Sequence, residues 1–141
     1  MMIDTCRPSK PKIVITAIYM LFILTTSLIP MDRQVYGLNF IIEFKSYIQN
    51  ILHIPLYAGL SILFLQLFKN YYPNISKRIV LIFVCCGGFG ILNEIIQSVI
   101  PGRYGGVGDI ILNLIGAMIG ILIFTFVERR QPGLLRRIIC E

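Results

Sequence analysis

The chain has 141 residues, of which 56% are hydrophobic and only 14% are charged. Soluble domains carry roughly 25% charged residues, and a soluble fold this short could not bury so much apolar surface. The formal net charge is +6, but the basic residues stand in short groups at the ends of apolar runs, a pattern that excludes the basic footprint of a nucleic-acid-binding protein. Composition therefore predicts one membrane domain over residues 1–141.

Four apolar runs follow one another, and each approaches the ~20 residues that an α-helix needs to cross the hydrocarbon of a bilayer. Helices are expected because lipid offers the backbone no hydrogen-bond partners. The predicted transmembrane helices cover residues 13–29, 47–68, 79–100 and 109–127. The first run could be the core of a signal peptide, but no small-x-small cleavage site follows it, so we interpret it as an uncleaved helix. The predicted fold class is all-α, a polytopic bundle of four spans.

Loop charge predicts the orientation of these helices. The tail before the first helix, the link between the second and third, and the tail after the fourth are strongly basic, whereas the other two loops are nearly neutral. By the positive-inside rule both termini lie in the cytoplasm, and the four spans then alternate without conflict. The predicted location is a bacterial cytoplasmic membrane.

The four cysteines do not indicate a disulfide or a thiol metal site. Cys85 and Cys86 are neighbours inside an apolar run, while Cys6 and Cys140 stand in the two basic tails. No C-x-x-C spacing is present, and the predicted cytoplasm is reducing. We therefore expect neither a bound metal nor a cofactor.

Polar side chains are concentrated at one predicted membrane face. With both termini inside, the second helix begins at the outer face, the third ends there and the fourth begins there. Ionised groups are costly in lipid and usually face the bundle interior, where they often mark function. The residues that this topology brings to the outer face are His53, Glu94, Gln97, Arg103, Asp109 and Asn113.

Helical periodicity places glycines in line with these polar residues. At about 100° per residue, Gly90 shares a stripe with Glu94 on the third helix, and Gly116 and Gly120 share one with Asn113 on the fourth. Small residues let helices approach closely, so we expect the third and fourth helices to pack together with Glu94 facing Asp109 and Asn113. Gly116 and Gly120 also fit the G-x-x-x-G motif of a homodimer, although packing within the monomer is the interpretation that we favour.

Each of these residues also has a simpler, structural interpretation. Asp109 is well placed to cap the fourth helix, and Asn113 could serve only to form a hydrogen bond between helices. A single histidine such as His53 is usually an interfacial residue rather than a metal ligand. Arg103 and His53 are the nearest expected partners for the carboxyl group of Glu94. Only the convergence of the whole set at one face indicates a site.

The spacing of the polar residues resembles a known family. Glu94 and Gln97 form an E-x-x-Q pair, Pro101-Gly102-Arg103 follows, and Asp109 opens a D-I-x-x-N-x-x-G-x-x-x-G segment. These motifs, with a weaker match around His53, resemble the VanZ-like family of bacterial membrane proteins over residues 47–122. The chain departs from many relatives at Gln49-Asn50, where they have an Asp-Lys pair.

The resemblance implies a role in the bacterial cell envelope, since the founding member is associated with resistance to the glycopeptide teicoplanin. The main hypothesis is a site for the head group of a membrane lipid or lipid-linked envelope precursor. Arg103 would meet its phosphate or carboxylate, and Glu94, Gln97, Asp109 and Asn113 would orient it. No nucleophile motif is recognisable, so no enzyme is predicted; Glu94 or Asp109 with His53 would be the acid/base set.

Two alternatives stay open from the sequence. In the first, the polar cluster only locks four helices together in a structural or interaction protein. In the second, the chain is a small transporter or proton path, which would need polar groups on both sides of the membrane midplane.

Overall fold

The computed structural model describes residues 10–28, 39–69, 71–99 and 106–130; within 39–49 it describes the helix but not the side chains. These residues form four α-helices and no strand: α1 (Lys10–Ser27), α2 (Asn39–Phe68), α3 (Ile75–Ser98) and α4 (Val107–Arg130). Each contains a stretch long and apolar enough to cross a membrane. The predicted all-α class with four spans is confirmed.

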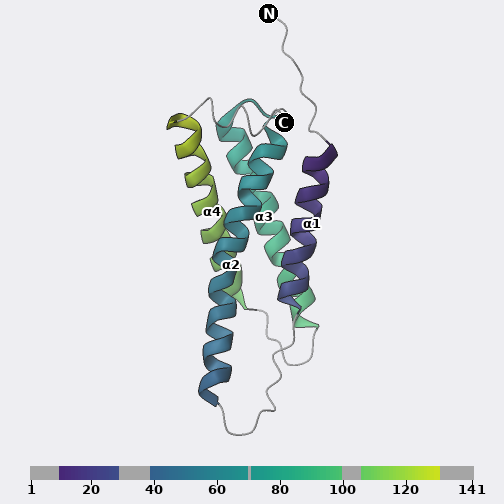
Figure 1. The fold of residues 1–141 in the computed structure, drawn as a ribbon, viewed down its shortest axis with the longest axis vertical. Helices are drawn as coiled ribbons and strands as arrows, with labels where there is room; N and C mark the ends of the chain where they lie inside the picture. Colours follow the sequence, from purple (N-terminus) through teal and green to yellow (C-terminus); the bar gives the residue numbers. More distant parts are fainter. Residues whose placement is uncertain (1–9, 29–38, 70, 100–105, 131–141) are drawn as a thin grey trace, which may run out of the picture.

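Consecutive helices run in opposite directions (Figure 1). The start of α1, the end of α2, the start of α3 and the end of α4 therefore lie at one end of the bundle, called here the terminal end. The start of α3 is fixed by Asn74, whose side chain accepts hydrogen bonds from the backbone N–H groups of Ser76 and Lys77. The opposite end is called the distal end.

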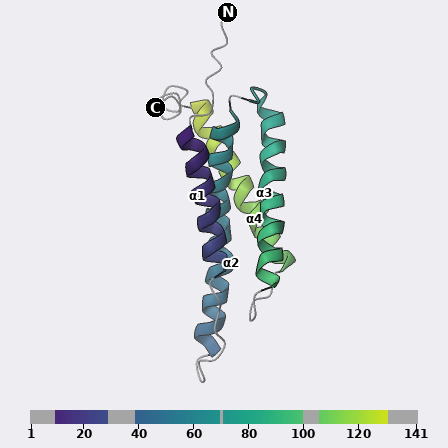
Figure 2. The same ribbon diagram turned by 90° about the vertical axis from the view of Figure 1, so that its right-hand side faces the viewer.

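Helix α2 is longer than the sequence predicted, because it begins at Asn39 and not near Tyr47. Its first turns extend past the distal ends of the other helices (Figures 1 and 2). Within the part of α2 whose side chains are described, the apolar stretch is Asn50–Phe68. The earlier turns contain Glu43 and Lys45, which is why hydropathy did not predict that the helix extends through them.

The core of the bundle lies mainly between α2 and α4, which form the most extensive helix interface. A Cβ added at Gly116 would overlap the backbone carbonyl of Ile54, and one added at Gly120 would overlap that of Ala58. The two glycines thus bring α4 against α2, whereas the predicted packing of α4 on α3 is confirmed but made by other residues. Periodicity identified the close-packing face correctly but could not say which helix covers it.

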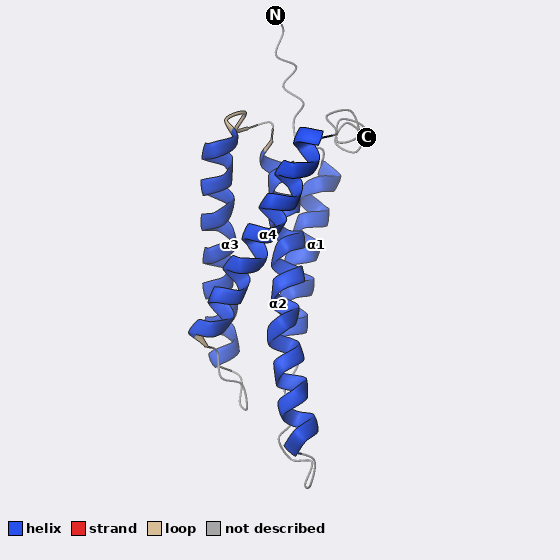
Figure 3. Cartoon of the chain, turned by 90° about the vertical axis from the view of Figure 1, so that its left-hand side faces the viewer, coloured by secondary structure: helices blue, strands red, loops and turns tan. Residues whose placement is uncertain are grey.

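Helix α4 crosses obliquely between α2 and α3 (Figure 3) and also contacts α3. On α3, a Cβ at Gly90 would lie 3.1 Å from the Asn113 side chain of α4. Helix α1 is more peripheral; its Tyr19 hydroxyl donates a 3.1 Å hydrogen bond to the Leu56 carbonyl of α2. Side chains of all four helices form one apolar core, which includes Ile23, Tyr57, Leu60, Leu65, Ile82, Cys86, Ala117, Ile121 and Phe124.

Charge is divided unequally between the two ends of the bundle. The described basic side chains all belong to the helix ends at the terminal end, where Glu128 is the one described acidic side chain. The basic residues are Lys10, Lys12, Lys69, Lys77, Arg78, Arg129 and Arg130. Seven positive charges less one negative charge leave a formal +6 at this end among the described side chains.

Candidate functional site

The structure buries four of the six predicted site residues in the distal half of the bundle. The exposed fractions are 4% for His53 of α2, 6% for Glu94 and 3% for Gln97 of α3, and 1% for Asn113 of α4. Two further polar side chains of this half, Tyr57 and Asn93, are fully buried. The set is called here the distal polar layer: His53, Tyr57, Asn93, Glu94, Gln97 and Asn113.

Glu94 is joined to the segment that leads into α4. Its Oε2 atom accepts a 3.0 Å hydrogen bond from the backbone N–H of Gly106, immediately before the helix. The Gly106 carbonyl in turn accepts a 3.0 Å bond from the N–H of Asp109. The segment of residues 101–108 contains four glycines and is called here the glycine-rich turn. The predicted approach of Glu94 to the start of α4 is therefore made through a backbone amide of this turn.

Asp109 lies inside the first turn of α4, which begins at Val107, and so is not the N-cap residue that the sequence suggested. A carboxylate in the first turn still interacts favourably with the helix dipole. Its side chain is partly exposed, unlike the four buried residues. Asp109 therefore borders the distal polar layer.

Aromatic rings line the layer on the side of α2. The rings of His53 and Tyr57 have centroids 6.2 Å apart, and those of Tyr57 and Phe89 of α3 are 6.0 Å apart, both in tilted arrangements. Such contacts are typical of packed aromatic pairs. Tyr57 is held between the two helices, and its phenol reaches a buried region.

Several polar atoms of the layer have no hydrogen-bond partner among the described residues. They are the Tyr57 hydroxyl, the Asn93 Oδ1, the Gln97 Nε2, and both Oδ1 and Nδ2 of Asn113. Burying such a group unpaired costs ~1–3 kcal/mol. These atoms offer donors and acceptors that a polar molecule could satisfy.

These distal residues carry the motifs that resemble the VanZ-like family, and a comparison with family models tests whether the chain belongs to it. The VanZ/LLP1 family model matches residues 5–128. The chain belongs to this family. Searches of the curated proteins and of the solved structures each gave no significant match.

The VanZ/LLP1 segment also contains a contact that sequence reasoning missed. The Asn93 Nδ2 donates a 3.1 Å hydrogen bond to the Ser27 hydroxyl, and both residues are buried. This bond joins α3 to α1. The sequence did show an asparagine beside Glu94 in an apolar helix. Nothing in it indicated that this side chain would form a hydrogen bond with the last turn of α1.

Not every VanZ/LLP1 residue proposed for the site can be placed. Arg103 and most of the glycine-rich turn lie outside the described residues, as do the loop after α1 and the cysteines of the two tails. Cys85 and Cys86 of α3 are free thiols, and within the described ranges no cluster of three His, Cys, Asp or Glu side chains could hold a metal ion.

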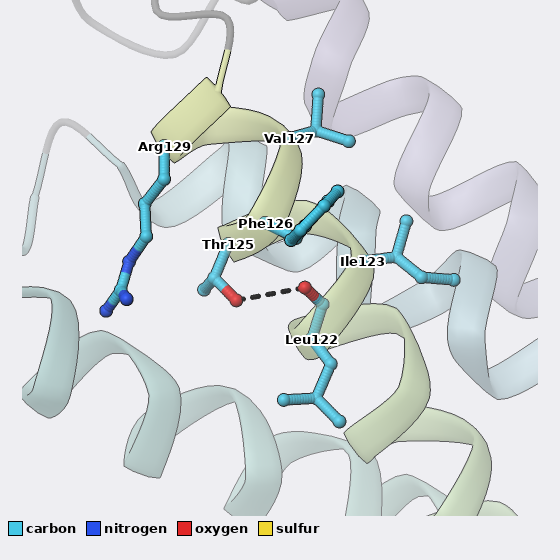
Figure 4. A pocket seen from close by; sticks show the side chains of 6 residues that line it. All are labelled: Leu122, Ile123, Thr125, Phe126, Val127 and Arg129. Carbon is cyan, nitrogen blue, oxygen red and sulfur yellow. Dashed lines mark hydrogen bonds between the residues drawn. The ribbon is translucent and has the colours of Figure 1, made fainter.

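A separate hollow lies on α4 near the terminal end (Figure 4). The Thr125 hydroxyl beside it donates a 3.1 Å hydrogen bond to the carbonyl of Leu122 in its own helix. Leu122 and Phe126 are more than half exposed within the apolar span, as expected of a lipid-facing surface. The lining residues are Leu122, Ile123, Thr125, Phe126, Val127 and Arg129.

Proposed function

We propose that this VanZ/LLP1 protein binds the polar head group of an anionic membrane lipid or lipid-linked envelope precursor at the distal polar layer. The observation that carries the proposal is the pair of buried amides, Gln97 of α3 and Asn113 of α4. Both are at least 97% buried, and both have polar atoms without partners among the described residues. Buried polar groups are normally hydrogen-bonded, so unpaired buried amides on two helices that pack together are suited to a polar ligand.

The chemistry of the layer suits a head group with hydroxyl or phosphate oxygens. Amides supply donors and acceptors together, and the Tyr57 hydroxyl adds one of each. The anionic part of the ligand would meet Arg103, with backbone N–H groups of the glycine-rich turn assisting. Glu94 supports this role because its carboxylate accepts a hydrogen bond from the N–H of Gly106 and so helps to fix the position of the turn.

The proposed orientation puts both termini in the cytoplasm and the distal polar layer in the outer leaflet of a bacterial cytoplasmic membrane. The formal +6 among described side chains at the terminal end supports this orientation by the positive-inside rule. An outer-leaflet site would face components on their way to the cell envelope. Binding of a lipid-linked wall precursor is the route by which such a protein would influence teicoplanin resistance.

A structural role is the second candidate, and two specific contacts favour it. The Asn93–Ser27 bond ties α3 to α1, and the Glu94–Gly106 bond ties α3 to α4. On this reading the layer fixes the helices and takes no ligand. The packing of Gly116 and Gly120 against α2 serves the monomer, so the glycine motif itself gives no support to a homodimer.

A transporter or proton path fits the described core less well. Between the distal polar layer and the terminal end, the buried side chains are mainly apolar, among them Leu60, Leu65 and Phe124. The Ser61 hydroxyl in this region bonds the Ala58 carbonyl of its own helix at 2.9 Å. A continuous path needs polar groups across the midplane.

The test is mass spectrometry of the lipids that co-purify with the wild type, with Gln97→Leu and with Gln66→Leu. Gln66 lies near the terminal end of α2, so its substitution makes the same chemical change away from the layer. We expect an anionic or lipid-linked species to be enriched by the wild type and Gln66→Leu and lost from Gln97→Leu. Identical lipids in all three proteins would refute the proposal.

A further inference from the structure

Among the residues that the structure describes, a buried arginine at the terminal end has only one carboxylate beside it. The Arg78 side chain, in the first turn of α3, is only 4% exposed. Its guanidinium has five N–H donors and stays charged in proteins. Its one ion-pair partner among the described residues is Glu128 of α4, with 3.5 Å between the Arg78 Nη2 and the Glu128 Oε2. Its Nε atom has no hydrogen-bond partner among these residues.

Glu128 is shared between two cations. Its Oε1 atom contacts the Lys69 ammonium group at the end of α2 at a much shorter distance, 2.7 Å. Two positive charges and one negative charge leave the Lys69–Arg78–Glu128 cluster at +1. A buried charge is costly unless it is paired, and among the described residues Arg78, the buried member, shares its carboxylate with Lys69, so the cluster can accept one further anion.

The cluster lies at the ends of three apolar helices. Arg78 is three residues after the start of α3 at Ile75, or about 4.5 Å along the helix axis. Lys69 directly follows α2, and Glu128 lies two residues before the last residue of α4. The ends of α2, α3 and α4 that carry these residues all lie at the terminal end of the bundle (Figures 1 and 3), where a bilayer's polar interface would be.

We infer that the Lys69–Arg78–Glu128 cluster binds a phosphate group, and that the source is an anionic phospholipid of the leaflet at the terminal end. A phosphodiester carries one negative charge, which brings the cluster to neutrality. Two of its oxygens would accept parallel hydrogen bonds from the guanidinium, which is the bidentate geometry in which arginine binds phosphate. This site is separate from the distal polar layer and stands whether or not the layer binds a ligand.

The test is native mass spectrometry of the protein in neutral detergent, titrated with phosphatidylglycerol or with phosphatidylcholine. The wild type is expected to bind phosphatidylglycerol at least about tenfold more tightly. Arg78→Gln should lose about tenfold in this affinity. The matched control is Lys77→Gln, an exposed cation beside it in the same helix turn, which should lose no more than about fivefold.

Glu128→Gln separates the ligand from a purely intramolecular ion pair. Because Glu128 competes with phosphate for the two cations, its neutralisation should strengthen binding of phosphatidylglycerol. Weakened binding in Glu128→Gln, or equal losses in Arg78→Gln and Lys77→Gln, would overturn the inference. If Arg78→Gln does not fold, the inference is still tested by two results. These are the preference of the wild type for phosphatidylglycerol and the direction in which Glu128→Gln changes its affinity.

Inorganic phosphate identifies the source of the phosphate. If millimolar phosphate leaves bound phosphatidylglycerol in place, the lipid is the ligand, as inferred. If it displaces the lipid from the wild type but not from Arg78→Gln, the cluster is a phosphate site that takes the free ion, and the assignment to a lipid is overturned.

Discussion

The Glu94 carboxylate and the Gly106 backbone N–H lie 3.0 Å apart, which joins the last turns of α3 to the start of α4. The connection between these helices contains the glycine-rich turn, and Glu94 is one of the most buried acidic groups described. A carboxylate that accepts a backbone hydrogen bond can fix the position of the turn beside it. This contact therefore links the fold of the distal end to any ligand that the turn helps to bind.

Removing the Glu94 acceptor should destabilise the protein. Glu94→Ala leaves the Gly106 N–H without its partner and should lower the free energy of unfolding by about 1–2 kcal/mol. Glu94→Gln keeps an acceptor oxygen and should lose less than half as much. Thermal unfolding in detergent measures both. A Glu94→Ala protein as stable as the wild type would mean that the bond is not important for the fold.

The two glycines of α4 should not tolerate a methyl group. Gly116→Ala and Gly120→Ala would each force a Cβ into the backbone of α2 and should cost about 1–3 kcal/mol of stability. Gly88→Ala is the matched control, because a Cβ there meets nothing within 4 Å. The same unfolding measurement compares the three variants. Equal effects at all three positions would contradict the packing of α4 on α2.

Asn93 and Ser27 should be energetically coupled. A double-mutant cycle with Asn93→Ala and Ser27→Ala isolates their shared term from the separate effect of each truncation. For a hydrogen bond between membrane helices we expect a coupling of about 0.6 kcal/mol, with ~1.7 as the upper limit. Strict additivity of the two substitutions would show that the bond contributes nothing to the attachment of α1.

The orientation predicts which exposed positions a membrane-impermeant thiol reagent can reach in intact cells. In a cysteine-free background, Val107→Cys at the distal end should be labelled from outside. Tyr71→Cys, between α2 and α3 at the terminal end, should be labelled only after the membrane is opened. Both native side chains are more than half exposed, so accessibility within the protein is matched. The reverse pattern would invert the proposed topology.

Hydropathy and periodicity were enough to predict four helices and the glycine-containing faces, because lipid restricts a chain this apolar to helices. They could not predict that α2 extends back to Asn39, since Glu43 and Lys45 interrupt the apolar pattern there. They also could not predict which neighbouring helix each glycine-containing face would contact. Gly116 meets Ile54 of α2, a contact that depends on how α2 and α3 both pack against α4.

For the candidate site, topology correctly indicated that polar residues from α2, α3 and α4 share one half of the bundle. His53, Glu94, Gln97 and Asn113 are all buried there. The sequence did not indicate Ser27, because a serine at a helix end has many ordinary roles. It also grouped Arg78 with the loop cations, since burial of an arginine depends on neighbours that the sequence does not reveal.

We propose that the unpaired amides of the distal polar layer bind a head group, and Asn113→Leu removes one of these amides. Asn113 has no hydrogen-bond partner among the described residues, so its replacement by leucine should leave thermal stability unchanged or higher. The measurement is a titration of wild type and Asn113→Leu with a polyprenyl phosphate, with thermal unfolding recorded in parallel. We predict that the stable variant loses at least about tenfold in affinity. Undiminished binding by Asn113→Leu, or a loss of binding that only accompanies unfolding, would contradict the claim.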